Sequence, residues 1–326
     1  MRSPFSVSAH RSAYRRGSGL ALTVVLCAGY VVWSSLAAAR TVAHPERHPQ
    51  TTWAPCNRNS RNGRASTFRP LSDIRAAQLV TPVPEDRPDN ATRYTIGGVG
   101  HVAANDYVPS RSELQRFRRA RTSAGQPILE FNSYFGYVDG RDGLRHPSTD
   151  DLIQWVAHKW GIPENWLRAE FVQESFWNQF QLGDEAQVSA RWYNAYPLQA
   201  RVPNSRRVYE SLGITQEKWI PDGSVGAGTE PLRWESTAFN LDYQAATIRF
   251  YYDNPQRERS AWGDRSYTPC QRWDSLGGWY NPYPWGNGGQ QGYIREVQGN
   301  LAGRAWLAPD FIHWRPSSLP PAVKLR

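Results

Sequence analysis

The 326-residue chain is poor in residues that serve as soft metal ligands or thiol nucleophiles, since it contains three cysteines and one methionine. Its seven histidines form no His-Glu-x-x-His run and no Cys/His cluster, so the sequence predicts no metal site. A Gly-x-Ser-x-Gly run is also absent, which excludes the nucleophile elbow of serine hydrolases. Residues 97–100 (Gly-Gly-Val-Gly) lack a following Lys-Ser/Thr pair and are interpreted as a flexible loop rather than a phosphate site. We therefore expect neither a metal nor a cofactor.

An excess of positive charge is missing from the C-terminal two thirds of the chain. Residues 126–326 carry 20 basic and 22 acidic side chains, although the whole chain has a net charge of +9. This balance excludes a basic platform for nucleic acid in that part. Residues 40–125 instead carry fourteen arginines and seven acids. We interpret this charge as favouring an anionic cell surface or envelope polymer.

The N-terminal segment has the pattern of an export signal. Four arginines within residues 1–16 precede an uncharged run over residues 17–39, which ends in three alanines. A small-residue end of this kind is typical of a signal-peptide cleavage site. A retained membrane anchor through residues 17–39 is the alternative, because the run is long enough to cross a bilayer. Either interpretation predicts a secreted or cell-envelope protein.

Two cysteines, Cys56 and Cys270, remain beyond this segment. In an oxidising compartment they are candidates for one disulfide, with unpaired thiols or a cross-link between chains as the alternatives. Residues 40–105 are rich in proline and arginine and are interpreted as a linker or irregular arm. We expect a catalytic domain over residues 106–310 and a tail over residues 311–326.

Helical periodicity begins near residue 148 and predicts a mainly α fold with long loops. A capping cluster at residues 148–151 opens a first helix that ends at Gly161, and Pro163 opens a second at its first position. A third helix is predicted over about 236–252, apolar on most sides, and a fourth over 290–301. The strand signals between these helices are too weak to predict a sheet.

Glu174 is the residue on which the chemistry depends. It follows Phe171 by three positions and Leu167 by seven, so it shares the inward side of the second helix near its C-terminal end. Aromatic neighbours and the negative end of the helix dipole both favour the protonated carboxyl, which raises its pKa. Such a group is a suitable proton donor for glycosidic bond cleavage. The alternative is a glutamate whose head reaches solvent at a frayed helix end.

Four short motifs, in order, resemble the soluble lytic transglycosylase and goose-type lysozyme group. Residues 169–175 (Ala-Glu-Phe-Val-Gln-Glu-Ser) resemble its catalytic Glu-Ser motif, and residues 211–216 (Ser-Leu-Gly-Ile-Thr-Gln) its Gly-x-Met-Gln turn. Residues 278–282 (Gly-Trp-Tyr-Asn-Pro) look like a variant of its Ala-Tyr-Asn-x-Gly motif, and Tyr293-Ile294 falls where the group has a Tyr-Val helix start. The resemblance covers roughly residues 145–307 and implies a lysozyme-like helical domain.

The resemblance implies a reaction on the glycan strands of peptidoglycan. Glu174 would protonate the oxygen that links N-acetylmuramic acid to N-acetylglucosamine, and would then act as base on the muramoyl 6-hydroxyl to form a 1,6-anhydro end. Ser175 would fix the surroundings of the acid, whereas Gln216 would bind sugar or the wall of the site, with Gly213 allowing close approach of the backbone. No nucleic-acid partner is implied.

The remaining substrate contacts are assigned by the third and fourth motifs and by aromatic residues. Tyr280 and Asn281 would contact the sugar beside Glu174, and Tyr293 would orient the carboxyl or the leaving sugar. Indole faces stack on pyranose rings, and Trp279 and Trp192 lie in polar stretches suited to this contact.

Two other functions stay open from the sequence. A true hydrolase would use a second carboxylate, such as Asp184 or Glu185, to activate water. A peptidoglycan-binding scaffold would keep the fold without turnover.

Overall fold

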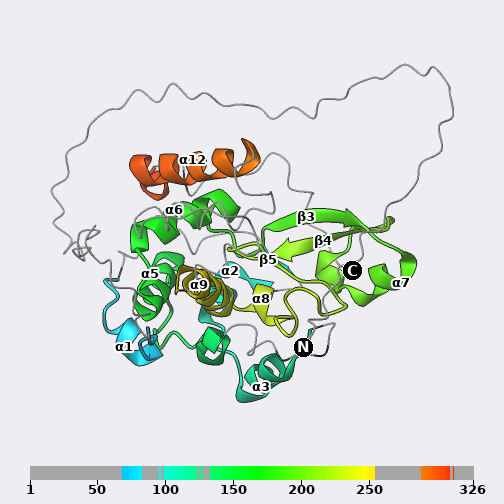
Figure 1. The fold of residues 1–326 in the computed structure, drawn as a ribbon, viewed down its shortest axis with the longest axis horizontal. Coiled ribbons are helices and arrows are strands. Elements are labelled where there is room, and N and C mark those ends of the chain that lie inside the picture. The colour runs from blue at the N-terminus through cyan, green and yellow to red at the C-terminus, as the bar shows by residue number, and fades with distance from the viewer. Residues whose placement is uncertain are drawn as a thin grey trace, which may run out of the picture. The chain divides into compact units, whose positions relative to one another are not determined.

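The structure is a computed structural model that describes residues 68–82, 95–96, 99–122, 125, 127, 133–253, 288–308 and 311. The described residues are mainly α-helical, with one three-stranded antiparallel sheet and one short two-stranded sheet (Figure 1). Within this described part, no helix combines the length and the hydropathy needed to cross a membrane. The predicted export segment over residues 17–39, the two cysteines and the C-terminal residues 312–326 lie outside the described residues.

The elements follow one another along the chain in a fixed order. The α-helices are α1 (Asp73–Ala77), α2 (His101–Asp106), α3 (Arg111–Arg119), α5 (Thr149–Trp160), α6 (Glu164–Ser175), α7 (Ala190–Ala195), α8 (Leu232–Glu235), α9 (Thr237–Asp253) and α12 (Gly288–Gly303). The short 3-10 helices are η2 (Ser133–Tyr137), η3 (Leu198–Ala200) and η4 (Ala305–Leu307). The strands are β1 (Thr95–Ile96), β2 (Val99–Gly100), β3 (Leu182–Gln187), β4 (Arg207–Leu212) and β5 (Glu217–Lys218).

The predicted helix boundaries are confirmed to within a few residues. Ser148 and Asp151 form a reciprocal capping box at the start of α5, and Gly161 ends the helix in the left-handed conformation. Pro163 is the residue before the first helical position of α6, not the first helical residue as predicted. Its extended backbone leads the chain out of the turn into the helix.

The centre of the core is α9, which packs on α5. Its described side chains are buried or half-buried on every side, in agreement with the prediction of a helix that is apolar on most sides. α6 lies between α5 and α12, so the predicted acid is carried by a helix with neighbours on two sides (Figure 1).

The three-stranded sheet was not predicted. Its strands lie in the order β3-β4-β5, with Leu182 opposite Leu212 and Glu185 opposite Tyr209. β3 consists of Leu-Gly-Asp-Glu-Ala-Gln, which has no β-branched or aromatic residue, so the usual strand signal is missing. The sheet forms because a second hydrophobic cluster packs against one of its faces. That cluster consists of Tyr196, Ala200, Val208, Leu212 and Trp234.

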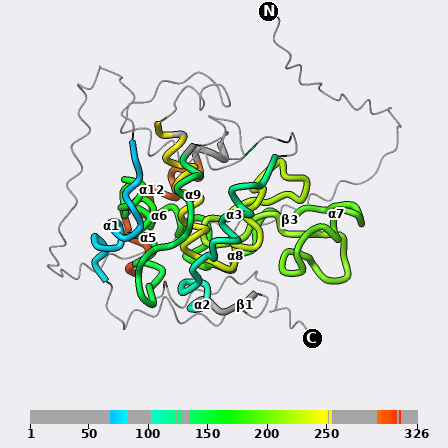
Figure 2. Tube along the Cα trace, turned by 90° about the horizontal axis from the view of Figure 1, so that it is seen from below, coloured from blue at the N-terminus to red at the C-terminus, as the bar shows by residue number. Residues whose placement is uncertain are grey.

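Part of the predicted arm over residues 40–105 packs against the helical core. α1 lies beside α5 (Figures 1 and 2), and the Leu71 amide donates to the Lys159 carbonyl at 3.0 Å. The Gln154 side chain accepts from the Thr81 amide at 3.0 Å and donates to the Thr81 carbonyl at 3.0 Å. For the residues that the structure describes, the predicted boundary at residue 105 therefore does not separate packed from unpacked chain.

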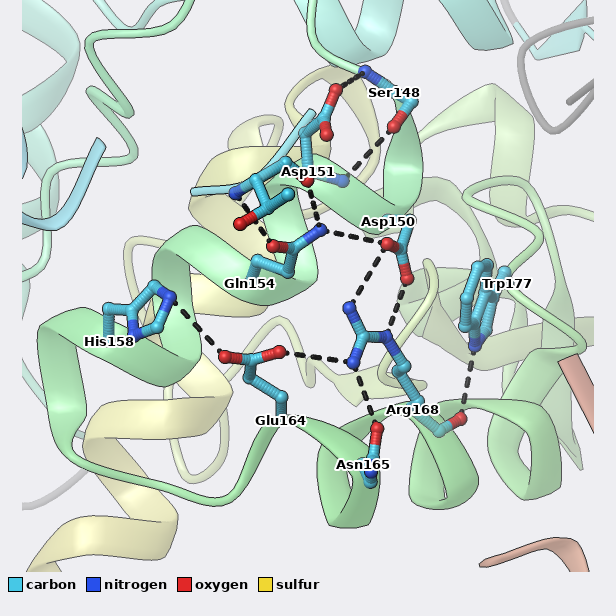
Figure 3. Close-up of polar contacts among 10 residues, drawn as sticks. Ser148, Asp150, Asp151, Gln154, His158, Glu164, Asn165, Arg168 and Trp177 are labelled. Carbon is cyan, nitrogen blue, oxygen red and sulfur yellow. Dashed lines mark hydrogen bonds and ion pairs between the residues drawn. The ribbon is translucent and has the colours of Figure 1, made fainter. Parts of the chain in front are cut away.

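A polar network fastens α6 to α5 (Figure 3). The Arg168 guanidinium forms a two-pronged contact with Asp150, from Nε at 2.6 Å and Nη2 at 3.1 Å. Its Nη1 also reaches Glu164 at 3.1 Å, while the Trp177 indole N–H donates to the Arg168 carbonyl at 3.1 Å. Bidentate arginine–carboxylate contacts fix geometry in two directions. These contacts with α5 therefore fix the position of α6 and of the turn that follows it.

Candidate functional site

Glu174 lies in the last turn of α6 and is half-buried. Desolvation raises the pKa of its carboxyl to about 8, to which the nearby negative charge of Asp184 adds, while a hydrogen bond from Tyr293 opposes the rise. The position at the C-terminal end of a helix acts in the same direction as burial, because the helix dipole disfavours negative charge there. The carboxyl is therefore protonated near neutral pH, as the sequence analysis anticipated.

The partner of this carboxyl comes from the other end of the described chain. The Tyr293 hydroxyl on α12 donates a hydrogen bond to Glu174 Oε1. Two further contacts join the same helices: Gln173 Nε2 donates to Glu296 at 2.7 Å, and Asn300 Nδ2 reaches Gln173 Oε1 at 3.4 Å. The resemblance-based expectation that Tyr293 meets the carboxyl is consistent with this geometry.

Backbone strain gathers in the segments around Glu174. Seven non-glycine residues among those described have a positive φ, and four of them belong to these segments. The four are Phe176 (53°), Trp177 (60°), Asp184 (50°) and Gln216 (54°). Left-handed conformations cost free energy in residues with a Cβ and cluster at functional sites in proteins. The segment after the acid and the facing turn are thus held in unusual geometry.

Ser175 connects the acid's helix to the second motif. Its side chain is buried, and Oγ donates to the Ile214 carbonyl at 2.7 Å. Gly213, in the same turn, has φ of 95°. A Cβ at Gly213 would lie 2.4 Å from Asn240 Nδ2 and 2.7 Å from the Arg233 carbonyl, so no larger residue fits. Ser175 therefore joins the end of α6 to this turn, and Gly213 allows the turn to pack closely against Asn240 and Arg233.

Gln216 closes the turn between β4 and β5. Its Nε2 donates to the Gln181 carbonyl at 3.1 Å and to the Gly213 carbonyl at 2.9 Å. Its Oε1 lies over β3, where a Cβ at Gly183 would come within 2.0 Å of it. The amide nitrogen is therefore used to hold the turn on the strand, and a contact of Gln216 with sugar stays a prediction.

Two amides that sequence reasoning missed hold the same turn in place. Gln179 accepts from the Ile214 amide at 3.2 Å and donates to the Arg233 carbonyl at 3.1 Å. Asn240 on α9 accepts from the Thr215 amide at 2.9 Å and from the Thr215 hydroxyl at 2.8 Å. Asn240 lies on a helix that the sequence predicts to be apolar on most sides, and this was a signal, because a buried amide requires partners.

Glu170 is a second buried carboxyl that the sequence analysis did not assign. It lies one helical turn before Glu174, has no exposed surface, and neither of its oxygens has a hydrogen-bond partner among the described residues. Desolvation raises its pKa well above the ordinary value, and the neighbouring Glu174 charge raises it further. Burial therefore favours the neutral form of Glu170.

The two candidates for a second carboxylate differ in their surroundings. Asp184 accepts from Ser211 Oγ at 2.8 Å, lies 3.5 Å from Lys218 Nζ, and its charge acts on Glu174. Glu185 is paired with Arg207 across the hairpin. Asp184 is accordingly the better placed of the two to act together with Glu174.

The face of the β3–β4 hairpin that carries Gly183 lies beside the turn at Gln216. Leu182 and Val208 pack into the second cluster. Strand alternation then places Glu185 and its partner Tyr209 on the opposite face, which also carries Gly183 beneath Gln216. Tyr209 is half-buried, with charged side chains beside it. A polar surface with an aromatic ring is suited to sugar contact.

Several predicted residues fall outside the described part of the chain. These are Trp279, Tyr280 and Asn281, and the disulfide candidates Cys56 and Cys270. Trp192 is described and is half-buried on α7, with the Arg191 guanidinium 5.6 Å from its ring centre.

Among the described residues, one group of acids is close enough to share a cation. Oxygen atoms of Asp73, Asp139 and Asp242 lie within 4.8 Å of one another. The ammonium of Lys159 lies among them, 2.7 Å from both Asp73 and Asp242. A cation of the protein itself therefore already lies between these carboxyls.

Comparisons of the chain with protein-family models, with curated proteins and with solved structures found no match.

Proposed function

We propose that the protein cleaves the bond between N-acetylmuramic acid and N-acetylglucosamine in peptidoglycan, with Glu174 as the catalytic acid. The observation that carries the proposal is the state of this carboxyl. It is protonated near neutral pH because burial raises its pKa to about 8, and it accepts the Tyr293 hydrogen bond. General acids work best when their pKa lies near the working pH.

The proposed reaction begins with transfer of the Glu174 proton to the bridging oxygen as the glycosidic bond breaks. The resulting carboxylate then takes the proton of the muramoyl 6-hydroxyl, whose oxygen bonds to the anomeric carbon. The product is a 1,6-anhydro end, and no water is consumed. One carboxylate is sufficient, since the substrate supplies the nucleophile.

Tyr293 and Ser175 support this chemistry from two sides. The Tyr293 hydroxyl holds one carboxyl oxygen and stabilises the carboxylate that forms after proton transfer. Ser175 joins the end of α6 to the turn at Ile214, so the acid and the facing turn move together. The lysozyme-like arrangement belongs to the same proposal: a helix ending in the acid, followed directly by a small antiparallel sheet.

The test is mass spectrometry of the products that the full chain releases from purified peptidoglycan, beside the Glu174→Gln variant. We expect anhydromuropeptides from the native protein and a loss of about a thousandfold or more in the variant, which keeps the shape of the side chain but cannot donate the proton. The Glu235→Gln variant, on α8, is the control. Near-normal turnover in Glu174→Gln would overturn the proposal.

A hydrolase is the second candidate, and the position of Asp184 favours it over a binding scaffold without turnover. The Asp184 carboxylate is close enough to Glu174 to act on the pKa of the acid, and a paired carboxylate can activate water. Products with a reducible muramic acid end would identify the hydrolase. Binding to sacculi without release of soluble products would identify a scaffold instead.

A further inference from the structure

The outer side of α3 is strongly basic. Residues 111–121 carry five arginines and a single glutamate. Leu114 and Phe117 are buried, so the helix packs on the core through these two residues. Helical spacing then directs Arg116 and Arg119 away from the core, while Arg111 lies in the first turn at the flank of the helix, and all three are exposed. We refer to these three residues as the arginine face.

The arginines of this face differ from those of the core in their partners. Arg168, Arg233 and Arg249 each form an ion pair with a carboxylate. None of the three residues of the arginine face forms an ion pair with any residue that the structure describes.

Glu113 and Arg121, the one acid and the last arginine of residues 111–121, form hydrogen bonds with nearby residues. Glu113 accepts from the Tyr107 hydroxyl at 2.6 Å and the Ser110 amide at 2.7 Å, as part of the helix cap. Arg121 Nη1 donates to the Arg119 carbonyl at 2.7 Å, which caps the other end. The positive charge of the outer side therefore exceeds the negative charge that its own helix supplies.

The arginine face lies away from the candidate acid. Figure 1 shows α3 on one side of the described residues and α6 and α12 on the opposite side. A ligand on α3 would leave Glu174 accessible. The two sites are consequently separable by experiment.

We propose that the arginine face binds an anionic, phosphate-bearing polymer of the cell envelope. Guanidinium groups pair with phosphate in a two-pronged geometry. Eight residues of helix, about 12 Å, separate Arg111 from Arg119. A polymer with repeated charges can contact all three arginines along this length, whereas a free phosphate contacts one.

The residues of α3 argue against two other polyanions. Interfacial membrane helices insert large apolar side chains, but Leu114 and Phe117 face the core. Single-stranded nucleic acid is held by stacking on exposed aromatic rings, and α3 exposes none. Binding of a wall-linked phosphate polymer requires only positive charge on the protein surface, which α3 provides. The location in the envelope is the one part of this inference that rests on the proposed function.

The experiment measures sedimentation of the full-length protein with cell walls that retain their phosphate polymers, and with the same walls after hydrofluoric acid has removed them. We expect binding to the intact walls to weaken about tenfold between 50 and 200 mM salt, as for a few released counterions. Binding to the stripped walls should be at least tenfold weaker. Equal binding to both preparations would overturn the proposal.

The decisive variant is the triple change Arg116→Gln, Arg119→Gln and Arg111→Gln, since glutamine keeps helix propensity and length but removes charge. Its binding to intact walls should fall about tenfold and lose most of its salt dependence. The control removes the same charge from other exposed arginines: Arg75→Gln, Arg191→Gln and Arg206→Gln. If the control loses as much affinity as the triple variant, net charge explains binding and the arginine face does not.

Two further arms separate this inference from the activity and from a lipid ligand. Turnover of soluble glycan fragments by the triple variant should equal that of the native protein, whatever products are formed. Vesicles that contain phosphatidylglycerol should bind less protein than intact walls do. Preferential binding to vesicles would overturn the choice of a wall polymer in favour of a lipid surface.

Discussion

Two groups of carboxyls in this protein differ in whether a cation lies beside them. At the junction of α1, α5 and α9, three aspartates surround Lys159, whose ammonium lies 2.7 Å from Asp242. Burial lowers the pKa of Lys159, but the neighbouring Asp242, Asp139 and Asp73 more than offset this, so its pKa is raised and it stays charged. The pKa of Asp73 is itself raised by burial, to about 7. On α6, the buried Glu170 and the half-buried Glu174 have no described cation beside them.

The difference separates two ways of placing an acid inside a protein. A buried carboxylate with a cation and hydrogen bonds contributes to structure, because removal of its cation leaves an uncompensated buried charge. Asp242 is of this kind, since it also accepts from the Trp160 indole at 2.6 Å. A carboxyl without a cation is held neutral and is able to give up a proton when its surroundings change. The first group holds the helices together, and the second can take part in proton transfer.

The largest expected effect is on stability, from removing the cation of the first group. Lys159→Met leaves three carboxylates around a buried methyl group, and we expect the free energy of unfolding to fall by about 3–5 kcal/mol at pH 7. Chemical denaturation measures this change. The matched control is Lys218→Met, where a more exposed pair with Asp184 and Glu210 contributes less than about 1 kcal/mol. Equal losses would show that burial does not distinguish the two lysines.

Substitution of Glu170 should increase stability, whereas substitution of Lys159 decreases it. Glu170→Leu replaces an unpartnered buried carboxyl, and we expect it to raise the free energy of unfolding by about 1–3 kcal/mol at pH 7. Because its folded-state pKa is raised, the native protein loses stability as pH rises above the ordinary value near 4.5. The gain in the variant should therefore be smaller at pH 4 than at pH 7. A variant that is less stable at pH 7 would contradict the absence of partners.

Tyr293→Phe sharpens the assignment of the acid. Its hydrogen bond lowers the pKa of Glu174, so its removal should move the alkaline limit of activity to higher pH. Turnover at pH 6 should fall about tenfold, because one stabilising contact to the carboxylate is lost. The pH–rate profile on peptidoglycan fragments provides both values, with Tyr137→Phe on the exposed η2 segment as the control. An unchanged profile would remove Tyr293 from the site.

Asp184→Asn should have the smallest effect if the substrate supplies the nucleophile. Loss of its negative charge lowers the pKa of Glu174, so the alkaline limit should move down by less than about one pH unit. Turnover should stay within about threefold of the native value. A loss of a hundredfold or more would instead assign Asp184 as the base of a hydrolase, and Ser211→Ala tests whether its position alone matters.

The sequence predicted the helical part of the fold because periodicity is local. α5, α6 and α9 were located from apolar spacing and from capping residues such as Ser148 and Gly161. The sheet was missed because β3 carries no strand-forming residues. Its pairing with β4 depends on a cluster assembled from residues 182–234, which no short window contains.

The same distinction applies to the site. The burial of Glu174 followed from its place on the inward side of a helix, and its link with Tyr293 from motif order. The contacts of Gln179 and Asn240 with the turn could not be predicted, since each amide bonds to backbone atoms more than twenty residues away. Glu170 had a signal that was overlooked, namely an acidic residue at an apolar position of the helix.

The composition of α12 affects how much of the time Tyr293 contacts Glu174. Five of the sixteen residues of this helix are glycine, the residue that most weakens a helix after proline. Docking onto α6, not intrinsic propensity, therefore keeps it folded. In hydrogen–deuterium exchange, amides of residues 288–303 should exchange well before those of α5 and α9. Each such opening would remove the Tyr293 hydroxyl from the carboxyl and raise the pKa of Glu174. Glu174 is therefore the stronger acid only while α12 is folded onto α6.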